Sequence, residues 1–337
     1  MSSDPRRILI VDPAFLGDAV FDAALARAAK TRWPGAEVGL VVRPPADQLA
    51  ARMPHVDRVH VFDKRGADRG LGGLRRVASV LAEVGYDLAL IPHPSLRSTW
   101  LAARAGIPER VGSAPGWLAR RWLTRWLPER SGDTFVGARL RLIDPAWATV
   151  PGELGQLGGV LEAARPPPAP EPRRVGLVLG SEWATKRWPV ERAAELLRAL
   201  DPERHVVVFL GAARERPLFE ALTAVLGGEG PPHEDAVGGD LGALLDRLAG
   251  LDVLVAGDTG PLHMARALGV PTVALFGPTP EDRHWPAPAD RVLTVPVDCR
   301  PCSPHGQHRC PKGHHRCLVD LGGGTVAGAV RAVLEGR

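Results

Sequence analysis

The amino-acid sequence predicts an α/β fold in which two doubly wound, Rossmann-like domains face each other across a cleft. Short apolar segments of strand length alternate with longer segments that suit helices, which is typical of a parallel sheet covered on both faces. This pattern occurs twice, on either side of a proline-rich stretch. A chain of 337 residues, of which 45% are hydrophobic, is long enough to give each domain its own core.

The first half begins with a β–α unit. The run RRILIV is typical of a buried parallel strand, a loop follows from Asp12 to Gly17, and the segment AVFDAALARAAKTRW continues as a helix. Three further strand-like runs, VGLVV, RVHVF and DLALIP, alternate with helical segments such as GLRRVASVLAEVG. We therefore expect a first domain over residues 1–163.

A proline-rich linker separates the two halves. Residues 164–174 have the sequence ARPPPAPEPRR, which contains too many prolines for a helix or a central strand and suits a stiff, extended spacer. The strand-like runs RVGLVLG, HVVVFLG, LDVLVAG and TVALFG follow, so a second domain is expected over residues 175–337. Such sheets bind ligands outside the carboxyl ends of their strands, and we look for functional residues in the loops there.

Composition and charge limit the class of function. No uncharged apolar stretch of about 18 residues appears, and the N-terminal residues run directly into a strand and do not resemble a signal peptide, so we expect a cytoplasmic protein. The net charge of +4 arises from 42 basic and 38 acidic residues, a small excess for a nucleic-acid-binding protein. No nucleic-acid partner is expected.

A candidate diphosphate site follows the strand-like run LDVLVAG. Asp258, Thr259 and Gly260 suit a tight turn, and Pro261 suits the first position of a helix. Free amides at the helix N-terminus favour an anion, which Asp258, Thr259 and His263 can orient. In the alternative interpretation, Asp258 or Thr259 only caps the helix and His263 packs against it.

Two other loops of the second half carry charged residues. Lys186 and Arg187 follow the run RVGLVLG, where a lysine suits a phosphate group or the charge that develops on a departing diphosphate. The alternative is a pair of solvated surface charges. After the next strand, Gly211 allows close approach of a ligand and Glu215 is placed to accept hydrogen bonds from ribose hydroxyls.

Asp18 stands at the expected start of the first helix. Its position alone favours an N-terminal cap. In a cleft that faces a sugar donor, the same carboxylate is placed to take a proton from an acceptor hydroxyl as general base. Both interpretations stay open at this point.

Basic and aromatic residues of the first half suggest a surface for an anionic glycolipid. Arg97 lies just past a strand end, and the segment PGWLARRWLTRWLP combines arginines with tryptophans. In the alternative interpretation the tryptophans pack into the domain and the arginines form a solvated face. The residues of this segment are Arg120, Arg121, Arg125, Trp117, Trp122 and Trp126.

All four cysteines lie within residues 299–317, interspersed with histidines. Disulfides are disfavoured in a cytoplasm, and four thiolates can close the tetrahedral shell of a structural zinc ion. The alternative is a set of reduced thiols in an ordered loop. The candidate ligands are Cys299, Cys302, Cys310 and Cys317.

Four segments together, FLGDAVFDAAL, SEWATKRWP, GAARE and GDTGPLHMARALGVPTVALFGPT, resemble glycosyltransferase family 9, in particular its lipopolysaccharide heptosyltransferase II branch. The resemblance implies a GT-B fold and inverting transfer of heptose from ADP-heptose, bound by the C-terminal domain, to the inner core of lipopolysaccharide, with the acceptor in the N-terminal domain. It also implies that catalysis requires no cofactor, and no metal-binding DxD triplet is present. An anionic glycolipid acceptor of the lipid A–core type implies peripheral contact with the inner membrane.

The resemblance assigns roles residue by residue. Asp18 resembles the family's catalytic base, Lys186 its phosphate-binding lysine and Glu215 its ribose contact. In such a displacement Asp18 deprotonates the acceptor, while Lys186 and a helix N-terminus stabilise the leaving ADP. Asp12 departs from the family pattern, so no role is implied for it. The residues that resemble the diphosphate-binding loop are Asp258, Thr259, Gly260 and His263.

Other functions are weighed against this one. A GT-B glycosyltransferase with another nucleotide-sugar donor would share the phosphate-binding residues. A non-catalytic nucleotide- or glycolipid-binding protein would share them too, but would not require Asp18. A nicotinamide-dependent dehydrogenase is disfavoured because the first β–α turn, VDPAFLGDA, lacks the GxGxxG spacing.

Overall fold

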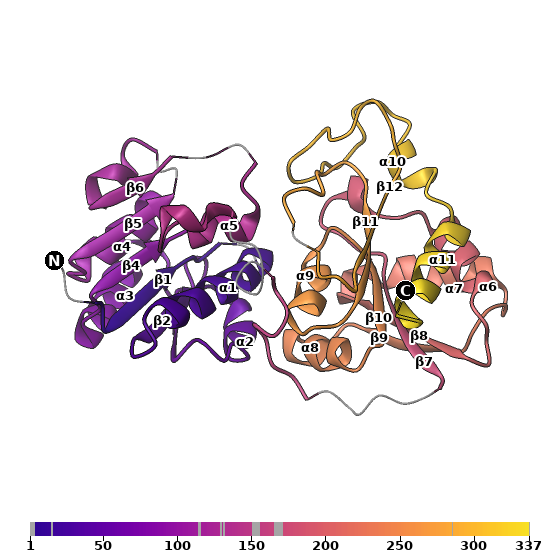
Figure 1. The fold of residues 1–337 in the computed structure, drawn as a ribbon, viewed down its shortest axis with the longest axis horizontal. Helices are drawn as coiled ribbons and strands as arrows, with labels where there is room; N and C mark the ends of the chain where they lie inside the picture. Colours follow the sequence, from indigo (N-terminus) through magenta and orange to yellow (C-terminus); the bar gives the residue numbers. More distant parts are fainter. Residues whose placement is uncertain are drawn as a thin grey trace. The chain divides into compact units, whose positions relative to one another are not determined.

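The computed structural model describes residues 4–14, 16–113, 116–128, 130, 132–149, 156–164, 171–284 and 286–336. The chain divides into two compact units (Figure 1). Unit 1 comprises Met1–Glu162 with Arg283–Trp285, and unit 2 comprises Ala163–Asp282 with Pro286–Arg337. Each unit contains a six-stranded parallel sheet with helices, which confirms the predicted α/β fold of two Rossmann-like domains.

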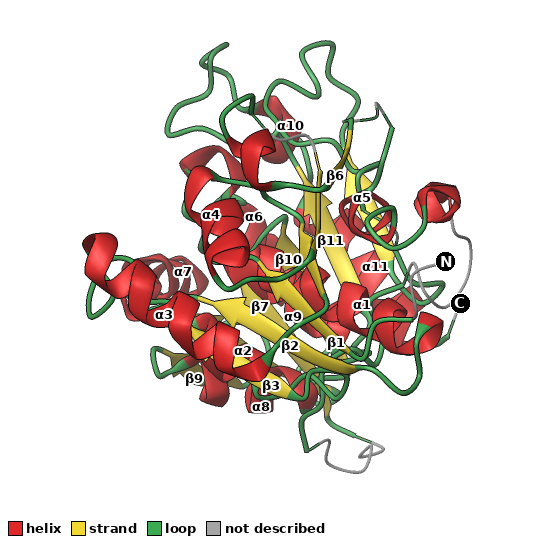
Figure 2. Ribbon diagram, turned by 90° about the vertical axis from the view of Figure 1, so that its left-hand side faces the viewer, coloured by secondary structure: helices red, strands yellow, loops and turns green. Residues whose placement is uncertain are grey.

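The sheet of unit 1 has the strand order β3-β2-β1-β4-β5-β6, in which β1, β2 and β3 lie side by side (Figure 2). Its strands are β1 (Arg7–Val11), β2 (Glu37–Val42), β3 (Arg58–Val61), β4 (Leu88–Ile91), β5 (Glu109–Ser113) and β6 (Arg125–Leu127). Its helices are α1 (Leu16–Arg32), α2 (Ala46–Ala50), α3 (Gly70–Val84), α4 (Leu96–Arg104) and α5 (Phe135–Leu140), with 3₁₀ turns η1 (Ala119–Trp122) and η2 (Pro145–Thr149).

The sheet of unit 2 has the order β12-β11-β10-β7-β8-β9, which is the same doubly wound order when its strands are counted from β7. Its strands are β7 (Arg173–Val178), β8 (His205–Gly211), β9 (His233–Val237), β10 (Val253–Gly257), β11 (Thr272–Phe276) and β12 (Arg291–Thr294). Its helices are α6 (Val190–Ala199), α7 (Arg216–Leu226), α8 (Leu241–Ala249), α9 (Gly260–Ala267), α10 (Arg316–Val319) and α11 (Gly323–Leu334), with 3₁₀ turns η3 (Ala184–Lys186) and η4 (Ala213–Glu215).

The central strands are buried on both faces, which explains their continuous apolar sequence. In unit 1, Leu9 and Val11 of β1 pack in one core cluster with residues of α3 and α4. Ile8 and Ile10 point to the other face, because side chains alternate along a strand, and both are fully buried. This arrangement fixes the strand positions and leaves the loops at the carboxyl ends to carry polar residues.

The structure corrects two sequence-based boundaries. Arg173 and Arg174 belong to β7, where they pair in parallel with β8, so the predicted extended linker of residues 164–174 ends before them. Its residues 165–170 lie outside the described residues. Helix α1 begins at Leu16 and therefore includes part of the predicted loop, whose Phe15 also lies outside the described residues.

No helix in the described part of the chain combines the length and the apolar character that a membrane span requires.

Candidate active site

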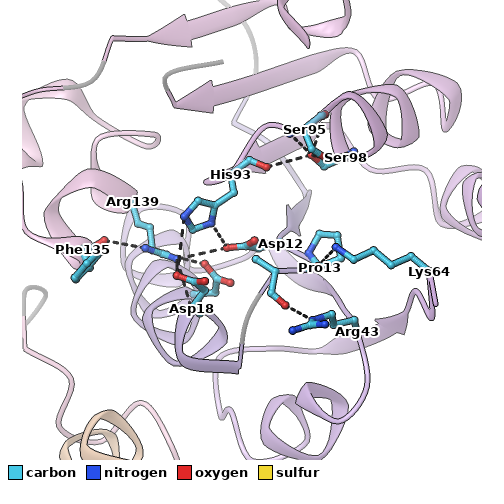
Figure 3. Close-up of polar contacts among 12 residues, drawn as sticks. Asp12, Pro13, Asp18, Arg43, Lys64, His93, Ser95, Ser98, Phe135 and Arg139 are labelled. Atoms are coloured by element: carbon cyan, nitrogen blue, oxygen red, sulfur yellow. Dashed lines mark hydrogen bonds and ion pairs between the residues drawn. The ribbon is translucent and has the colours of Figure 1, made fainter. Parts of the chain in front are cut away.

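A buried ionic network lies at the carboxyl ends of β1 and β4, two neighbouring strands of unit 1 (Figure 3). Asp12 follows β1, and its side chain has no exposed surface. Its Oδ2 accepts a hydrogen bond of 2.8 Å from Nδ1 of His93, which follows β4. The same oxygen accepts a longer bond of 3.4 Å from Nη2 of Arg139 in α5.

Arg139 joins this pair to helix α1. Its Nε donates to Oδ1 of Asp22 over 2.8 Å, and its Nη2 donates to Oδ1 of Asp18 over 3.3 Å. One buried guanidinium therefore faces the carboxyl groups of Asp12, Asp18 and Asp22. Burial opposes the charge on Arg139, but the three neighbouring carboxylates raise its pKa above the usual value, so the side chain stays a cation.

The pKa values of Asp12 and Asp22, which share this site, shift in opposite directions. Burial, followed by the negative charge of Asp12, raises the pKa of Asp22 well above its usual value. Burial acts in the same direction on Asp12, but the hydrogen bond from His93 and the charges of His93 and Arg139 lower its pKa. A protonated Asp22 can donate to Asp12, which gives partners to Asp12 Oδ1 and Asp22 Oδ2, two buried oxygens with no other partner among the described residues.

Asp18 is the member of the network that lies near the surface. Its side chain is 20% exposed, and its Oδ1 lies 3.9 Å from Nε2 of His93. Because α1 begins at Leu16, Asp18 stands inside the first turn of the helix, and the interpretation of Asp18 as an N-terminal cap is wrong. The Arg139 guanidinium holds its carboxylate instead.

Cations gather around the loop that carries Asp12. Lys64 Nζ donates to the Pro13 carbonyl over 2.6 Å, and Arg43 Nε donates to the Ala14 carbonyl. Burial, followed by the charges of Arg43, Arg97 and a further arginine, lowers the pKa of Lys64. Arg97 is exposed in the first turn of α4, so the structure brings this predicted acceptor-binding residue near the network.

The aromatic segment of residues 116–128 remains largely at the surface. Trp117 is 73% exposed and Trp126 is 41% exposed, so the interpretation that the tryptophans pack into the domain is wrong for these two. The guanidinium of Arg120 lies over the Trp126 ring, 3.9 Å from its centroid. Arg121 is exposed as well, and both predicted arginines are therefore accessible to a ligand.

In unit 2, the residues predicted to bind diphosphate lie together at the carboxyl ends of β7 and β10. Lys186 Nζ donates to Oδ2 of Asp258 over 2.6 Å and to its carbonyl over 3.1 Å. His263 Nε2 lies 3.3 Å from Oδ1 of Asp258. Gly257 permits this approach, because a Cβ there would lie 2.8 Å from the Lys186 carbonyl oxygen. The interpretation of Lys186 as a solvated surface charge is wrong, since its side chain is only 12% exposed.

The predicted turn leads directly into α9. Thr259 is the N-cap residue, but its side chain makes no capping bond and donates instead to the Gly257 carbonyl over 3.2 Å. The amides of the first turn are therefore not capped by the threonine hydroxyl. Burial lowers the pKa of His263 even though Asp258 opposes this effect, so the imidazole is uncharged near neutral pH.

Glu215 and Arg187 complete the loops at this edge. A Cβ on Gly180 would lie 2.0 Å from the Glu215 carboxyl carbon, and one on Gly211 would lie 2.7 Å from its Oε2, so both glycines leave room for this side chain. Oε2 accepts from the Ala212 amide over 2.9 Å. Arg187 donates twice to the Ser181 carbonyl, at 3.0 and 2.9 Å, which assigns it to loop structure.

The four cysteines line one pocket of unit 2. All are free thiols, and Cys299 Sγ lies 3.9 Å from Nε2 of His314. In the described part of the chain no three of these sulfurs lie within 4.8 Å of one another, so a metal ion would have to draw them together. The pocket wall is tied to the loop of Lys186, because Thr185 exchanges backbone and hydroxyl hydrogen bonds with Gln307.

Sequence reasoning missed His93, Arg139 and Asp22. Asp18 and Asp22 are four residues apart on one helix, a spacing that places two like charges side by side and signals a shared cation. His93 also follows a predicted strand. Arg139 carries no such signal, because it lies 117 residues from Asp22 in the sequence.

Comparisons with known proteins show which family this chain resembles. The model of "Glycosyltransferase family 9 (heptosyltransferase)" matches residues 74–315. Lipopolysaccharide heptosyltransferase 1 of Pseudomonas aeruginosa is 32% identical over 94% of this chain and 91% of its own length. Lipopolysaccharide heptosyltransferase 2 of Salmonella typhimurium is 26% identical over 94% of both chains.

The solved structure of the ADP-heptose lipopolysaccharide heptosyltransferase II of E. coli has a TM-score of 0.80 to this chain. It is 24% identical and covers 98% of this chain and 99% of its own. Such a likeness extends over both units and confirms the two-domain GT-B fold.

Proposed function

Because this chain belongs to glycosyltransferase family 9, we propose that it transfers heptose from ADP-heptose to the inner core of lipopolysaccharide, with inversion at the anomeric carbon. The chain is a glycosyltransferase. One observation carries the class of donor, a sugar linked to a nucleoside diphosphate, and the choice of heptose rests on the family. Lys186 and Asp258 form a buried ion pair next to the N-terminus of α9, the combination that suits a nucleoside diphosphate.

On the donor side, we assign the diphosphate to Lys186, Asp258, Thr259, Gly260 and His263. The ammonium group of Lys186 and the amides of α9 meet the negative charge both in the bound donor and in the leaving ADP. Asp258 orients Lys186 and His263. Glu215, held at the neighbouring strand ends, is assigned to the ribose hydroxyls.

On the acceptor side, we assign Asp18 as the general base. Its carboxylate takes the proton of the attacking hydroxyl, the hydroxyl oxygen forms a bond to the anomeric carbon, and the bond from that carbon to ADP breaks. Lys186 and α9 receive the charge of the departing ADP, so the proposed step needs no metal ion. No covalent enzyme intermediate is required.

We propose that the acceptor is an anionic glycolipid of the lipid A–core type, reached by peripheral contact with the inner membrane. Arg97 lies among the cations around the Asp12 loop and suits acidic groups of the acceptor. The accessible Arg120 and Arg121, next to the exposed Trp117 and Trp126, suit the interface of a membrane.

A transfer assay tests this function. The purified protein is given ADP-heptose and a panel of truncated lipid A–core acceptors, with UDP- and GDP-sugars as control donors. We expect heptose transfer to one acceptor of the panel and none from the control donors. Transfer from a control donor alone would indicate a related glycosyltransferase, and donor binding without transfer in any combination would indicate a non-catalytic binding protein.

We also propose that the four cysteines bind a structural zinc ion. Four thiols around one pocket are a suitable ligand set for zinc, and the pocket is tied through Thr185 to the loop that presents Lys186. Such an ion would order this loop and would take no part in the bond changes.

A further inference from the structure

The free edge of the His93 ring faces Asp18. The Nδ1 atom of His93 is engaged by the buried Asp12 carboxylate, which fixes the proton of the neutral ring on Nδ1. The Nε2 atom is left on the opposite edge, 3.9 Å from Oδ1 of Asp18. The His93 side chain is 49% exposed, so this edge is accessible to a ligand and to water.

The gap between these two atoms fits one oxygen atom. A distance of 3.9 Å is too long for a direct hydrogen bond. An oxygen about 2.8 Å from each atom fits between them, and a hydroxyl there can donate its single proton to either acceptor in turn. A substrate hydroxyl in that place contacts Asp18 and His93 at once.

We propose that His93 is a second catalytic residue of the transfer, whose Nε2 contacts the acceptor hydroxyl beside Asp18 and receives the proton of that hydroxyl. This inference rests on the proposed function. The hydroxyl proton passes to Asp18 as the new glycosidic bond forms and the bond to ADP breaks. It then moves to Nε2 of His93, which becomes an imidazolium and releases the proton to water.

The surroundings of His93 suit this role. It faces Asp12 from the end of β1, Asp18 from α1 and Arg139 from α5, with Asp22 of α1 behind Asp12. Burial alone would lower the pKa of His93, but the hydrogen bond and the charge of Asp12 raise it above the usual value. The ring is therefore a better proton acceptor than an ordinary histidine, while Ser98 Oγ holds its backbone by donating to the His93 carbonyl over 3.2 Å.

A purely structural role predicts different behaviour. If His93 only balances the charge of Asp12, its loss weakens the fold and lowers the rate equally at every pH. A proton acceptor must be uncharged, so the rate of the native enzyme falls as the pH drops through the pKa of His93. The pH dependence of kcat separates the two roles.

The experiment measures kcat against pH at saturating ADP-heptose and acceptor for the native chain, His93→Gln and Asp12→Asn. We expect His93→Gln to lower kcat by about tenfold to a hundredfold, at or below the low end of what acid–base groups contribute, and to abolish the fall of kcat at low pH that the pKa of His93 sets. Asp12→Asn removes the charge that raises the pKa of His93, so in this variant the fall of kcat on the acidic side of the profile should occur at lower pH. His60→Gln is the matched control, because His60 contacts Tyr86 at 2.7 Å elsewhere in the unit.

Two results would overturn the proposal. The first is that kcat and its pH profile are unchanged in His93→Gln. The second is that His93→Gln loses rate equally at every pH while the fall of kcat at low pH occurs at the same pH in Asp12→Asn as in the native chain. If His93→Gln does not fold, NMR titration of the His93 ring in the native chain and in Asp12→Asn decides between the two roles. The catalytic role is rejected if the pKa of His93 is the same in both proteins. It is also rejected if the pKa of His93 in the native chain differs from the pKa that the rate profile gives. A native chain that transfers no heptose refutes the proposed function itself, and that outcome is distinct from both.

Discussion

The two units share one sheet order but build their polar sites in opposite ways. Unit 1 places three carboxyl groups and a histidine around one buried arginine, so each of these groups shifts the pKa of its neighbours. Unit 2 uses one lysine, one aspartate and an uncharged histidine beside a helix N-terminus. The first arrangement suits the movement of a proton, and the second suits the binding of an anion.

The comparison predicts that loss of a cation destabilises unit 1 most. Arg139→Met leaves Asp12, Asp18 and Asp22 without their shared partner, and we expect a loss of roughly 3–5 kcal/mol in the free energy of unfolding. Transfer should be lost as well. Urea denaturation measures the effect, with Arg58→Met as control, since the Arg58–Glu37 pair is at the surface and its loss should leave stability unchanged. Equal stability of the two variants would contradict the interdependence of the network.

The next largest effect is expected on turnover. Asp18→Asn keeps the size of the side chain but removes the proposed base, so kcat should fall by about a hundredfold or more while ADP-heptose binding stays nearly intact. Calorimetric titration and a rate assay measure the two quantities. The matched control is Glu83→Gln, on an exposed position of α3. Native turnover in Asp18→Asn would remove this residue from the mechanism.

A smaller effect on rate, joined to weaker binding, is expected in unit 2. Lys186→Ala removes a cation that contacts the diphosphate before and during its departure, and donor affinity should fall at least about tenfold, since a hydrogen bond to a charged group contributes roughly 1.5–3 kcal/mol. The exposed Lys312, changed to alanine, is the control. If donor affinity and rate are both unchanged in Lys186→Ala, the lysine has no role in the donor site.

The smallest effect on transfer concerns the cysteines of unit 2. EDTA in the reaction should leave the rate unchanged, because protein groups assist the departure of ADP and a structural zinc ion is slow to strip. Elemental analysis should find one zinc ion per chain, and a Cys299→Ser/Cys302→Ser variant should lose it and melt at lower temperature.

Two outcomes oppose this picture. Absence of metal from protein purified under reducing conditions with zinc supplied would refute the site. Rapid inactivation by EDTA that magnesium or manganese reverses at once would contradict metal-independent transfer.

The sequence predicts local features better than long-range ones. The β10–α9 turn is recognisable because Asp258, Thr259 and Gly260 are consecutive and follow an apolar run. Arg139 reaches Asp12 across 127 residues, and only the packing of α5 against α1 brings them together. The assignment of Arg283–Trp285 to unit 1 likewise depends on tertiary contacts that no local pattern encodes.

The raised pKa of Asp22 links the folding of this chain to the binding of a proton. In the unfolded chain Asp22 has an ordinary pKa and is ionised at neutral pH, whereas in the folded chain its pKa is raised well above that value by burial and by Asp12. At a pH between these two values, unfolding releases a proton into solution, and the stability of the fold declines as the pH rises from the ordinary pKa to the raised one. A pH-sensitive dye in weakly buffered solution should report acidification when the protein is unfolded at a pH within that range, and Asp22→Asn should reduce that signal.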